Sequence, residues 1–206
     1  MQLSIVRGHA GRLEDPVLRA MFEARKQVFA DLLKWDVPVL GGRYEVDQFD
    51  DVNATYLVLS EAGGGHLASA RLLETERPHI LDSLFPDLCE DPPPRGPAIR
   101  EITRFCLDRR LTARTRRGVR DTLVHALARH ALDHGITSYT GVAEMGWLQQ
   151  ILAFGWDCAP LGLPRYHGTR LLGALRIAIT PDTPHLLALA GLADLAPPPA
   201  LRRLAA

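Results

Sequence analysis

Four charged residues lie in segments whose apolar pattern predicts burial. Arg25 sits on the apolar stripe of an expected helix, Arg71 lies inside a strand-like run, and Glu101 and Arg104 share a second such run. Buried charges are costly unless they are paired or used in a site. A carboxylate such as Glu101 can accept a proton from a substrate, and arginines bind anionic groups. The pattern therefore favours a built site over a plain core.

A segment rich in acids follows the first expected helix. Residues 34–51 lack clear periodicity, contain Pro38 and two adjacent glycines, and are expected to form a long loop. The loop carries four acids: Glu45, Asp47, Asp50 and Asp51. Together with the arginines, these acids favour a site for a zwitterionic ligand. An ion-pair network that only ties the edge of a sheet together remains the alternative.

A basic run precedes and enters the longest expected helix. Such a run is usually a solvated face, but at the start of a helix the free backbone N–H groups also favour anions. A phosphopantetheine arm, coenzyme A or an acidic carrier protein would each suit it. The run comprises Arg109, Arg110, Arg114, Arg116, Arg117 and Arg120.

Composition sets the remaining bounds. The 206 residues are 47% hydrophobic with a formal net charge of zero, which predicts one domain over residues 1–206 and no nucleic-acid or membrane partner. Three distant cysteines indicate a reducing, cytoplasmic compartment. No signal peptide is expected at residues 1–11, and no apolar run approaches about 20 residues. Dinucleotide, phosphate-loop and serine-nucleophile motifs are absent, and the scattered histidines do not predict a metal site.

Periodicity predicts alternating strands and helices, which is typical of an α/β fold with a mixed sheet. Helices are expected at residues 16–32, 119–134 and around 148–152, with a further one before a proline-rich tail that follows Ala196. Strands are expected at residues 55–59, 66–72, 98–107, 137–142 and 175–179. Strict alternation in residues 98–107 places Glu101 and Arg104 on opposite faces, so both can line one cleft only if the strand bulges or splays.

In this order, the charged and aromatic residues resemble the acyl-homoserine-lactone synthases, the autoinducer synthase family. The resemblance covers roughly residues 20–160 and is loose from about residue 160 onward. It rests on Arg25-Lys-Gln-Val-Phe29, Trp35, Glu45-Val-Asp47-Gln-Phe-Asp50, Ala70-Arg71-Leu-Leu, Phe85 and Glu101-Ile-Thr-Arg104-Phe105.

The resemblance implies a three-layer α-β-α sandwich similar to GNAT-type acyltransferases, with a V-shaped cleft in the sheet for the thioester arm. It also implies an acyltransferase that makes an N-acyl-homoserine lactone, a quorum-sensing signal, from S-adenosylmethionine and an acyl thioester. Amide formation comes first, and lactonisation then releases methylthioadenosine. S-adenosylmethionine is thus a co-substrate, no cofactor or metal is expected, and the donor is acyl carrier protein or acyl-CoA.

The resemblance also implies roles for single residues. Glu101 is the expected base, and Arg104 is catalytic as well as substrate-binding. S-adenosylmethionine is expected to contact Arg25, Phe29, Trp35, Asp47, Asp50, Arg71, Arg104 and Phe105, with Glu45 as an orienting residue. The acyl pocket is expected to include Thr103, Thr140, Met145, Leu148 and Leu152, and the basic run to dock the carrier. One departure is Arg100, where many relatives carry an aromatic residue.

Two other functions fit the residues alone. A GNAT-type N-acyltransferase that uses acyl-CoA on another amine would share the anion-binding helix start. A non-catalytic ligand-binding regulator would use the charged network as a sensor. Release of methylthioadenosine separates both from the synthase.

Overall fold

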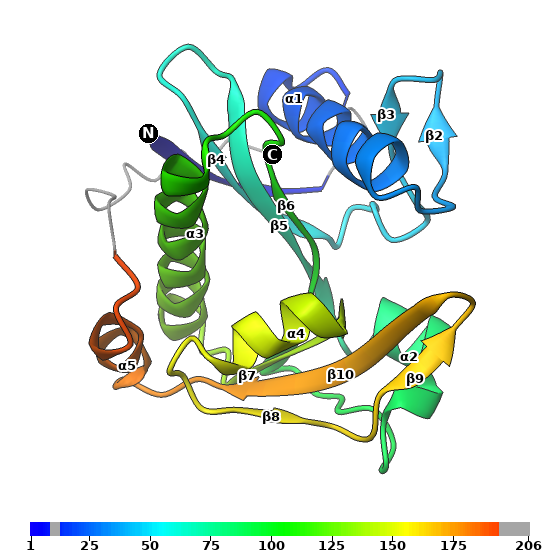
Figure 1. Ribbon diagram of the computed structural model, residues 1–206, viewed down its shortest axis with the longest axis vertical. Helices are drawn as coiled ribbons and strands as arrows, with labels where there is room; N and C mark the ends of the chain where they lie inside the picture. The colour runs from blue at the N-terminus through cyan, green and yellow to red at the C-terminus, as the bar shows by residue number, and fades with distance from the viewer. Residues whose placement is uncertain (9–12, 194–206) are drawn as a thin grey trace. The chain divides into compact units, whose positions relative to one another are not determined.

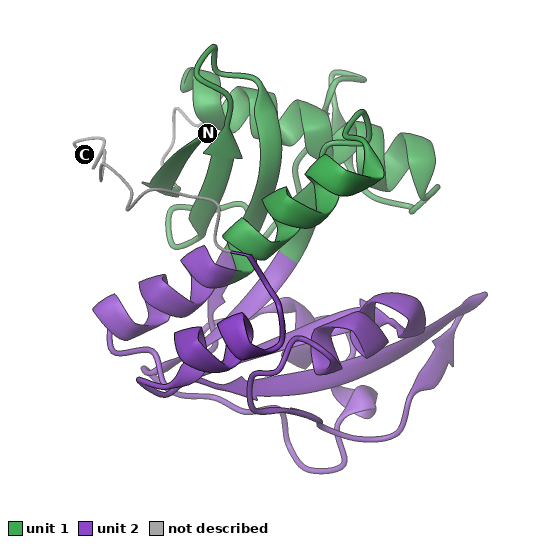
Figure 2. Cartoon of the chain, turned by 60° about the vertical axis from the view of Figure 1, so that its left-hand side comes forward, with its two compact units in different colours: residues 1–71, 104–124, 194–206 green, residues 72–103, 125–193 purple. Residues whose placement is uncertain are grey.

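The structure is a computed structural model that describes residues 1–8 and 13–193 of the chain (Figure 1). The described chain divides into two compact units (Figure 2). The first contains residues 1–71 and 104–124, and the second contains residues 72–103 and 125–193. Strands β5 (His66–Glu74) and β6 (Ile99–Leu107) and helix α3 (Ala113–Asp133) contribute residues to both units. The expected single domain stays a prediction, and the proline-rich tail lies outside the described residues.

The first unit is built on four strands in the order β1 (Gln2–Arg7), β4 (Thr55–Ser60), β5 and β6. Strand β1 runs antiparallel to β4, with Gln2 opposite Ser60. Periodicity does not predict β1, because the apolar residues of this short edge strand do not alternate strictly.

Helix α1 (Pro16–Arg25) begins where the sequence predicts. The Asp15 carboxylate accepts hydrogen bonds from the N–H groups of Val17 (2.7 Å) and Leu18 (3.2 Å), and Pro16 fills the first helical position. The expected α-helix up to residue 32 is wrong in its second half, which is a π-helix, η1 (Lys26–Leu32). The prediction that residues 34–51 form only a loop is also wrong in part, because the segment contains the antiparallel strands β2 (Val39–Leu40) and β3 (Tyr44–Glu45).

The second unit contains the mixed part of the sheet, as expected. Strand β6 runs parallel to β7 (Ser138–Glu144), which pairs antiparallel with β10 (Arg170–Ala178). Two short strands that periodicity missed, β8 (Cys158–Pro160) and β9 (Arg165–His167), both pair with β10. The helical segments of this unit are α2 (Ile80–Leu84), η2 (Pro86–Leu88), α4 (Met145–Leu152) and α5 (Thr183–Leu189), with the C-terminal part of α3.

Helices α2 and α4 cover opposite faces of the sheet in the second unit. Leu172 and Ala174 of β10 pack with Leu81 of α2. Gly173, which lies between them, faces α4, because a Cβ built on it would lie 2.7 Å from a methyl group of Leu148. Successive strand residues point to opposite faces. The α-β-α layering implied by the resemblance is therefore confirmed within this unit.

The parallel pairing of β6 with β7 is short. It covers Ile99–Glu101 against Ser138–Thr140, although both strands continue beyond it. The expected V-shaped opening stays a prediction. No helix among the described residues is long and apolar enough to cross a membrane.

Candidate functional site

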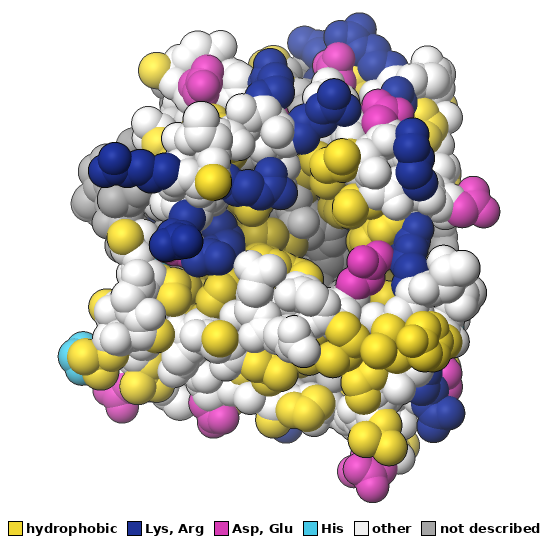
Figure 3. All heavy atoms as spheres, in the orientation of Figure 1, with side chains coloured by type: hydrophobic (Ala, Val, Ile, Leu, Met, Phe, Trp, Pro, Cys, Tyr) yellow, Lys and Arg dark blue, Asp and Glu magenta, His cyan; other side chains and the backbone are white. Residues whose placement is uncertain are grey.

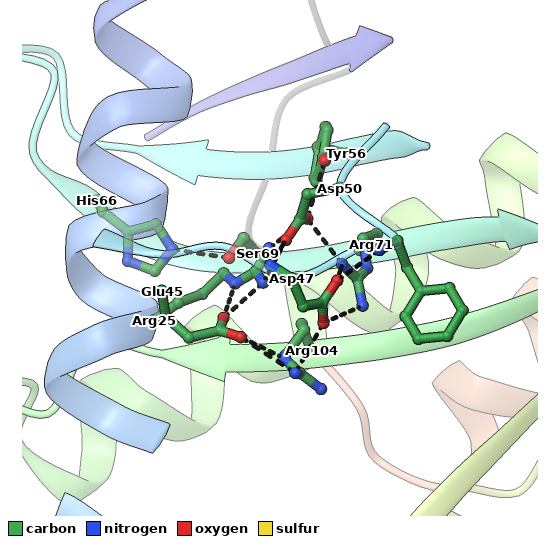
Figure 4. A network of polar contacts seen from close by, with 10 residues as sticks. Arg25, Glu45, Asp47, Asp50, Tyr56, His66, Ser69, Arg71 and Arg104 are labelled. Carbon is green, nitrogen blue, oxygen red and sulfur yellow. Dashed lines mark hydrogen bonds and ion pairs between the residues drawn. The ribbon is translucent and has the colours of Figure 1, made fainter. Parts of the chain in front are cut away.

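Three arginines and three acids form one buried network in the first unit (Figure 4). The network confirms the expected pairing of buried arginines with acids, and its formal charges balance. Each member comes from a different place in the chain: Arg25 ends α1, Glu45 ends β3, Asp47 and Asp50 follow β3, Arg71 lies on β5 and Arg104 on β6.

Asp50 holds two of the arginines together. Arg25 donates to both oxygens of Asp50, at 2.8 and 2.9 Å, and Arg71 contacts Oδ1 at 2.7 Å. The backbone N–H of Asp47 donates to Oδ2 at 2.8 Å, and the Tyr56 hydroxyl donates to Oδ1 at 2.9 Å. Sequence reasoning missed Tyr56, because a tyrosine in an apolar strand resembles core. The signal was its hydroxyl, which needs a partner when buried.

Asp47 and Glu45 connect this pair to Arg104. Asp47 accepts two hydrogen bonds from Arg71 (2.6 and 3.0 Å) and one from Arg104 (2.8 Å). Glu45 accepts from Arg104 through Oε1 (3.0 Å) and from Arg25 through Oε2 (2.5 Å). The six charged groups therefore form a continuous chain of contacts.

Electrostatics distinguish Arg104 from the other two arginines. Burial would lower the pKa of Arg25, but Asp50 and Glu45 raise it above the usual value. Burial also opposes ionisation of Asp50, yet Arg25 and Arg71 lower its pKa well below the usual range. For Arg104 the balance is reversed: burial, together with repulsion from Arg25 and Arg71, outweighs the acids and lowers its pKa. An additional negative charge would be most favourable beside Arg104.

Arg104 is also the most solvent-accessible member of the network. About a tenth of its side chain is exposed, 12% against 1% for Arg25 and 0% for Arg71. Its φ angle is +49°, in the left-handed region that costs a non-glycine residue energy. The regular alternation expected for residues 98–107 is therefore wrong at Arg104, where the strand departs from a regular ladder.

An aromatic pair lies next to Arg104. The rings of Phe29 and Trp35 stack with centroids 4.8 Å apart, and the Arg104 guanidinium lies 5.6 Å from the Phe29 centroid. The π-helix brings the pair together, since Trp35 donates its backbone N–H to the carbonyl of Phe29 (2.8 Å). Phe105, the remaining expected contact, follows Arg104 on β6 and is half-buried.

Glu101 lies in the second unit and is fully buried. Its two oxygens accept hydrogen bonds from the backbone N–H groups of Ile80 (2.8 Å) and Leu81 (3.0 Å), at the start of α2. The carboxylate thus fixes the beginning of this short helix. Each carboxylate oxygen has a second lone pair, so these bonds do not preclude proton transfer.

The residues expected to form the acyl pocket do not share one face of the sheet. Thr140 pairs with Glu101 across β6 and β7, so its side chain points to the α2 face, as does that of Thr103. Leu148 packs over Gly173 on the opposite face. Met145 and Leu152 belong to the same helix, α4. The expected acyl pocket stays a prediction, and sequence spacing does not tell which face of the sheet a following helix covers.

Three members of the basic run are held by contacts to acids or to a backbone carbonyl. Arg110 donates to the Asp108 carboxylate, with the shortest contact at 2.6 Å, Arg116 donates to the Asp108 carbonyl (3.2 Å), and Arg120 pairs with Asp121 (2.6 Å). Arg109, Arg114 and Arg117 are exposed and form no ion pair with an acid among the described residues, whereas Arg110 is exposed and paired with Asp108. Figure 3 shows Lys and Arg side chains gathered around the N-terminal part of α3.

Two buried histidines predict how stability depends on pH. Burial lowers the pKa of His66 and of His130 to about 4, from 6.5. As the pH falls, each histidine is therefore protonated in the unfolded chain before it is protonated in the folded one. The free energy of unfolding is highest above pH 6.5 and decreases between pH 6.5 and pH 4. We expect each histidine to cost on the order of 1.4 kcal/mol per pH unit in this window. Denaturant unfolding from pH 7.5 to 4.5 measures the slope.

His66→Gln should flatten that slope while keeping a hydrogen-bonding partner for Ser69, whose hydroxyl lies 2.9 Å from Nε2 of His66 (Figure 4). Equal slopes for the variant and the wild type would contradict the assignment.

Comparison with known proteins gives consistent matches. The family model described as autoinducer synthase matches residues 10–181. An acyl-homoserine-lactone synthase from Ralstonia nicotianae is 31% identical over 199 residues, which cover 93% of this chain and 96% of the relative. A solved CoA-dependent acyl-homoserine lactone synthase, BjaI, with SAM and isopentyl-CoA, is 27% identical with a TM-score of 0.80, covering 93% of this chain and 90% of that one.

A more distant likeness concerns the fold alone. An acyl-CoA N-acyltransferase from Pseudomonas aeruginosa is 18% identical with a TM-score of 0.55, covering 86% of this chain and all of that one. The likeness to acyltransferases of the GNAT type is thereby confirmed for the architecture.

Proposed function

We infer the reaction from one premise, which is that this chain belongs to the autoinducer synthase family. It is an acyltransferase that makes an N-acyl-homoserine lactone from S-adenosylmethionine and an acyl thioester. The observation that carries this function in the structure is the balanced network of three arginines and three acids, with Arg104 at its solvent-accessible end beside the Phe29–Trp35 pair.

We propose that Arg104 receives the carboxylate of S-adenosylmethionine. The lowered pKa and partial exposure of Arg104 favour an added anion, and a guanidinium binds a carboxylate through paired hydrogen bonds. The stacked Phe29 and Trp35 would hold the adenosyl and sulfonium end through aromatic contact and cation–π attraction. Arg25, Arg71 and Asp50 are buried behind Arg104 and orient it through Glu45 and Asp47.

The first chemical step is amide formation. Glu101, three residues before Arg104 on β6, is the proposed base that takes a proton from the substrate α-amine. The amine then attacks the thioester carbonyl and the C–N bond forms. The C–S bond breaks, and the proton that the nitrogen loses passes to the sulfur, which leaves as the carrier thiol. Backbone N–H groups near Arg104 and Phe105 are the proposed donors to the oxyanion.

The second step closes the lactone. A carboxylate oxygen attacks the carbon bonded to the sulfonium, the C–S bond breaks, and methylthioadenosine leaves as a neutral thioether. This step needs the carboxylate and the carbon held in line more than it needs acid or base. Binding the carboxylate and the sulfonium end at two fixed points would provide that alignment.

We propose that the donor docks through the exposed Arg109, Arg114 and Arg117, because the other members of the basic run are tied to acids or to backbone. Exposed arginines suit the phosphates of acyl-CoA or the acidic surface of acyl carrier protein. The bound isopentyl-CoA in the similar solved structure supports the first donor. We place the reaction in the cytoplasm, with support from the free thiols of Cys89, Cys106 and Cys158.

Incubation with S-adenosylmethionine and an acyl thioester tests the function. We expect one methylthioadenosine and one free thiol per turnover, measured by chromatography and a thiol reagent, with the lactone identified by mass spectrometry. Acyl-CoA and acyl carrier protein are supplied in separate reactions across a salt series, because docking on exposed arginines weakens as salt rises. Thiol release without methylthioadenosine would instead support a plain N-acyltransferase, and neither product would support a binding regulator.

A further inference from the structure

We propose that Tyr56 is a positioning residue of the S-adenosylmethionine site, which acts by fixing the Asp50 carboxylate between Arg25 and Arg71. This inference rests on the proposed function of the network. Tyr56 has no exposed surface, so it would act on the substrate through the charged residues and not by direct contact.

The contact of Tyr56 is specific. Its hydroxyl donates to Oδ1 of Asp50 at 2.9 Å, the same oxygen that Arg25 and Arg71 contact at 2.8 and 2.7 Å (Figure 4). Two cations thus share one oxygen with a neutral donor, and the geometry of that oxygen decides where both guanidinium groups lie. A buried tyrosine hydroxyl remains a donor throughout the pH range of the reaction, because burial and the Asp50 charge raise the pKa of Tyr56.

The ring of Tyr56 is also held in place by aromatic packing near Arg25. It meets the Phe22 ring edge-on, with centroids 5.9 Å apart, and the Arg25 guanidinium lies 5.0 Å from the Phe22 centroid. Phenylalanine at position 56 would keep this aromatic contact and remove only the hydroxyl. The substitution therefore isolates the hydrogen bond from the packing.

A chain of contacts leads from Tyr56 to the accessible end of the network. Asp50 contacts Arg71, Arg71 pairs with Asp47 at 2.6 Å, and Asp47 accepts from Arg104 at 2.8 Å. When the hydroxyl is lost, Asp50 and the two arginines can rearrange, and the position of Asp47 relaxes with them. The expected consequence is weaker binding of S-adenosylmethionine, with little effect on the acyl donor.

The test compares Tyr56→Phe with Tyr139→Phe. Tyr139 is an equally buried strand tyrosine whose hydroxyl donates to the Leu127 carbonyl at 3.0 Å, away from any charged group named in the network. Both variants lose one buried hydrogen bond, so a purely structural effect would be alike. We expect Y56F to raise the KM for S-adenosylmethionine about tenfold, leaving kcat and the KM for the acyl donor within about twofold. Y139F should change neither KM.

A double-mutant cycle identifies the route. If Tyr56 acts through Asp50, Y56F has no further effect on the KM for S-adenosylmethionine in a D50N background. An unchanged KM in Y56F, equal effects in Y56F and Y139F, additive effects in the cycle, or loss of the fold in Y56F alone would each overturn the inference. Absence of methylthioadenosine from the wild type would instead refute the proposed function.

Discussion

Replacing Glu101 with glutamine is expected to lower kcat about 10²–10⁴-fold, the range that a positioned general base contributes. The amide cannot take the proton from the substrate amine. An α-amine loses its proton to solvent near pH 8, so the deficit of E101Q should shrink as the pH rises to 9. Initial rates of methylthioadenosine release between pH 6.5 and 9 measure this change.

The pH profile separates chemistry from structure, which matters because Glu101 also fixes the start of α2 through Ile80 and Leu81. A deficit that stays constant from pH 6.5 to 9 would show that Glu101 only holds the helix. Asp82→Ala is the matched control. It removes the hydrogen bond from the His79 N–H to Asp82 (2.9 Å) and loosens the same helix start without touching Glu101. We expect D82A to cost about 1 kcal/mol of stability and to keep the wild-type pH profile.

Replacing Arg104 with methionine is expected to lower kcat/KM for S-adenosylmethionine about 10²–10³-fold. Truncating one partner of a desolvated charge pair costs about 2–5 kcal/mol in binding, and each 1.4 kcal/mol is about tenfold. The effect should appear mainly in the KM for S-adenosylmethionine, with the KM for the acyl donor little changed. Steady-state kinetics with each substrate varied in turn, together with calorimetric binding of S-adenosylmethionine, provide the measurement.

Two further variants control this prediction. Arg104→Lys keeps the charge but loses the planar fork that contacts Glu45 and Asp47 together, so we expect it to retain stability but recover little binding. Arg43→Gln breaks an exposed ion pair with Glu23 (3.2 Å) in the same unit and should be silent, as exposed pairs contribute about 0–1 kcal/mol. If R104M binds S-adenosylmethionine as tightly as the wild type does, Arg104 is not part of the binding site.

The sequence predicted the six charged members of the network but not the contacts between them. Misplaced charges on apolar stripes mark residues that need partners, and this is why Arg25, Arg71 and Arg104 could be selected together with the acids. The partners lie far along the chain: 25 residues separate Arg25 from Asp50, and 59 separate Arg104 from Glu45. Periodicity indicates which face of a helix or strand is buried. It does not indicate which side chain from a distant part of the sequence contacts that face.

Local signals were reliable where the energy is local. The start of α1 at Asp15 and Pro16 and the strand pair around three adjacent glycines follow from capping, alternation and turn chemistry. The short strands β8 and β9 were not predicted, because three residues are too few to show a strand periodicity. Their pairing with β10 depends on the tertiary structure.

The chain alone therefore determined the residue types of the site, their order, and the elements that carry most of them. Only the tertiary structure decided that Tyr56 joins the network, that Arg104 adopts a left-handed backbone, and that Thr140 and Leu148 point to opposite faces of the sheet. The physical reason is common to all three. Each outcome depends on contacts between elements distant in sequence, whose energy outweighs the preference of any single residue.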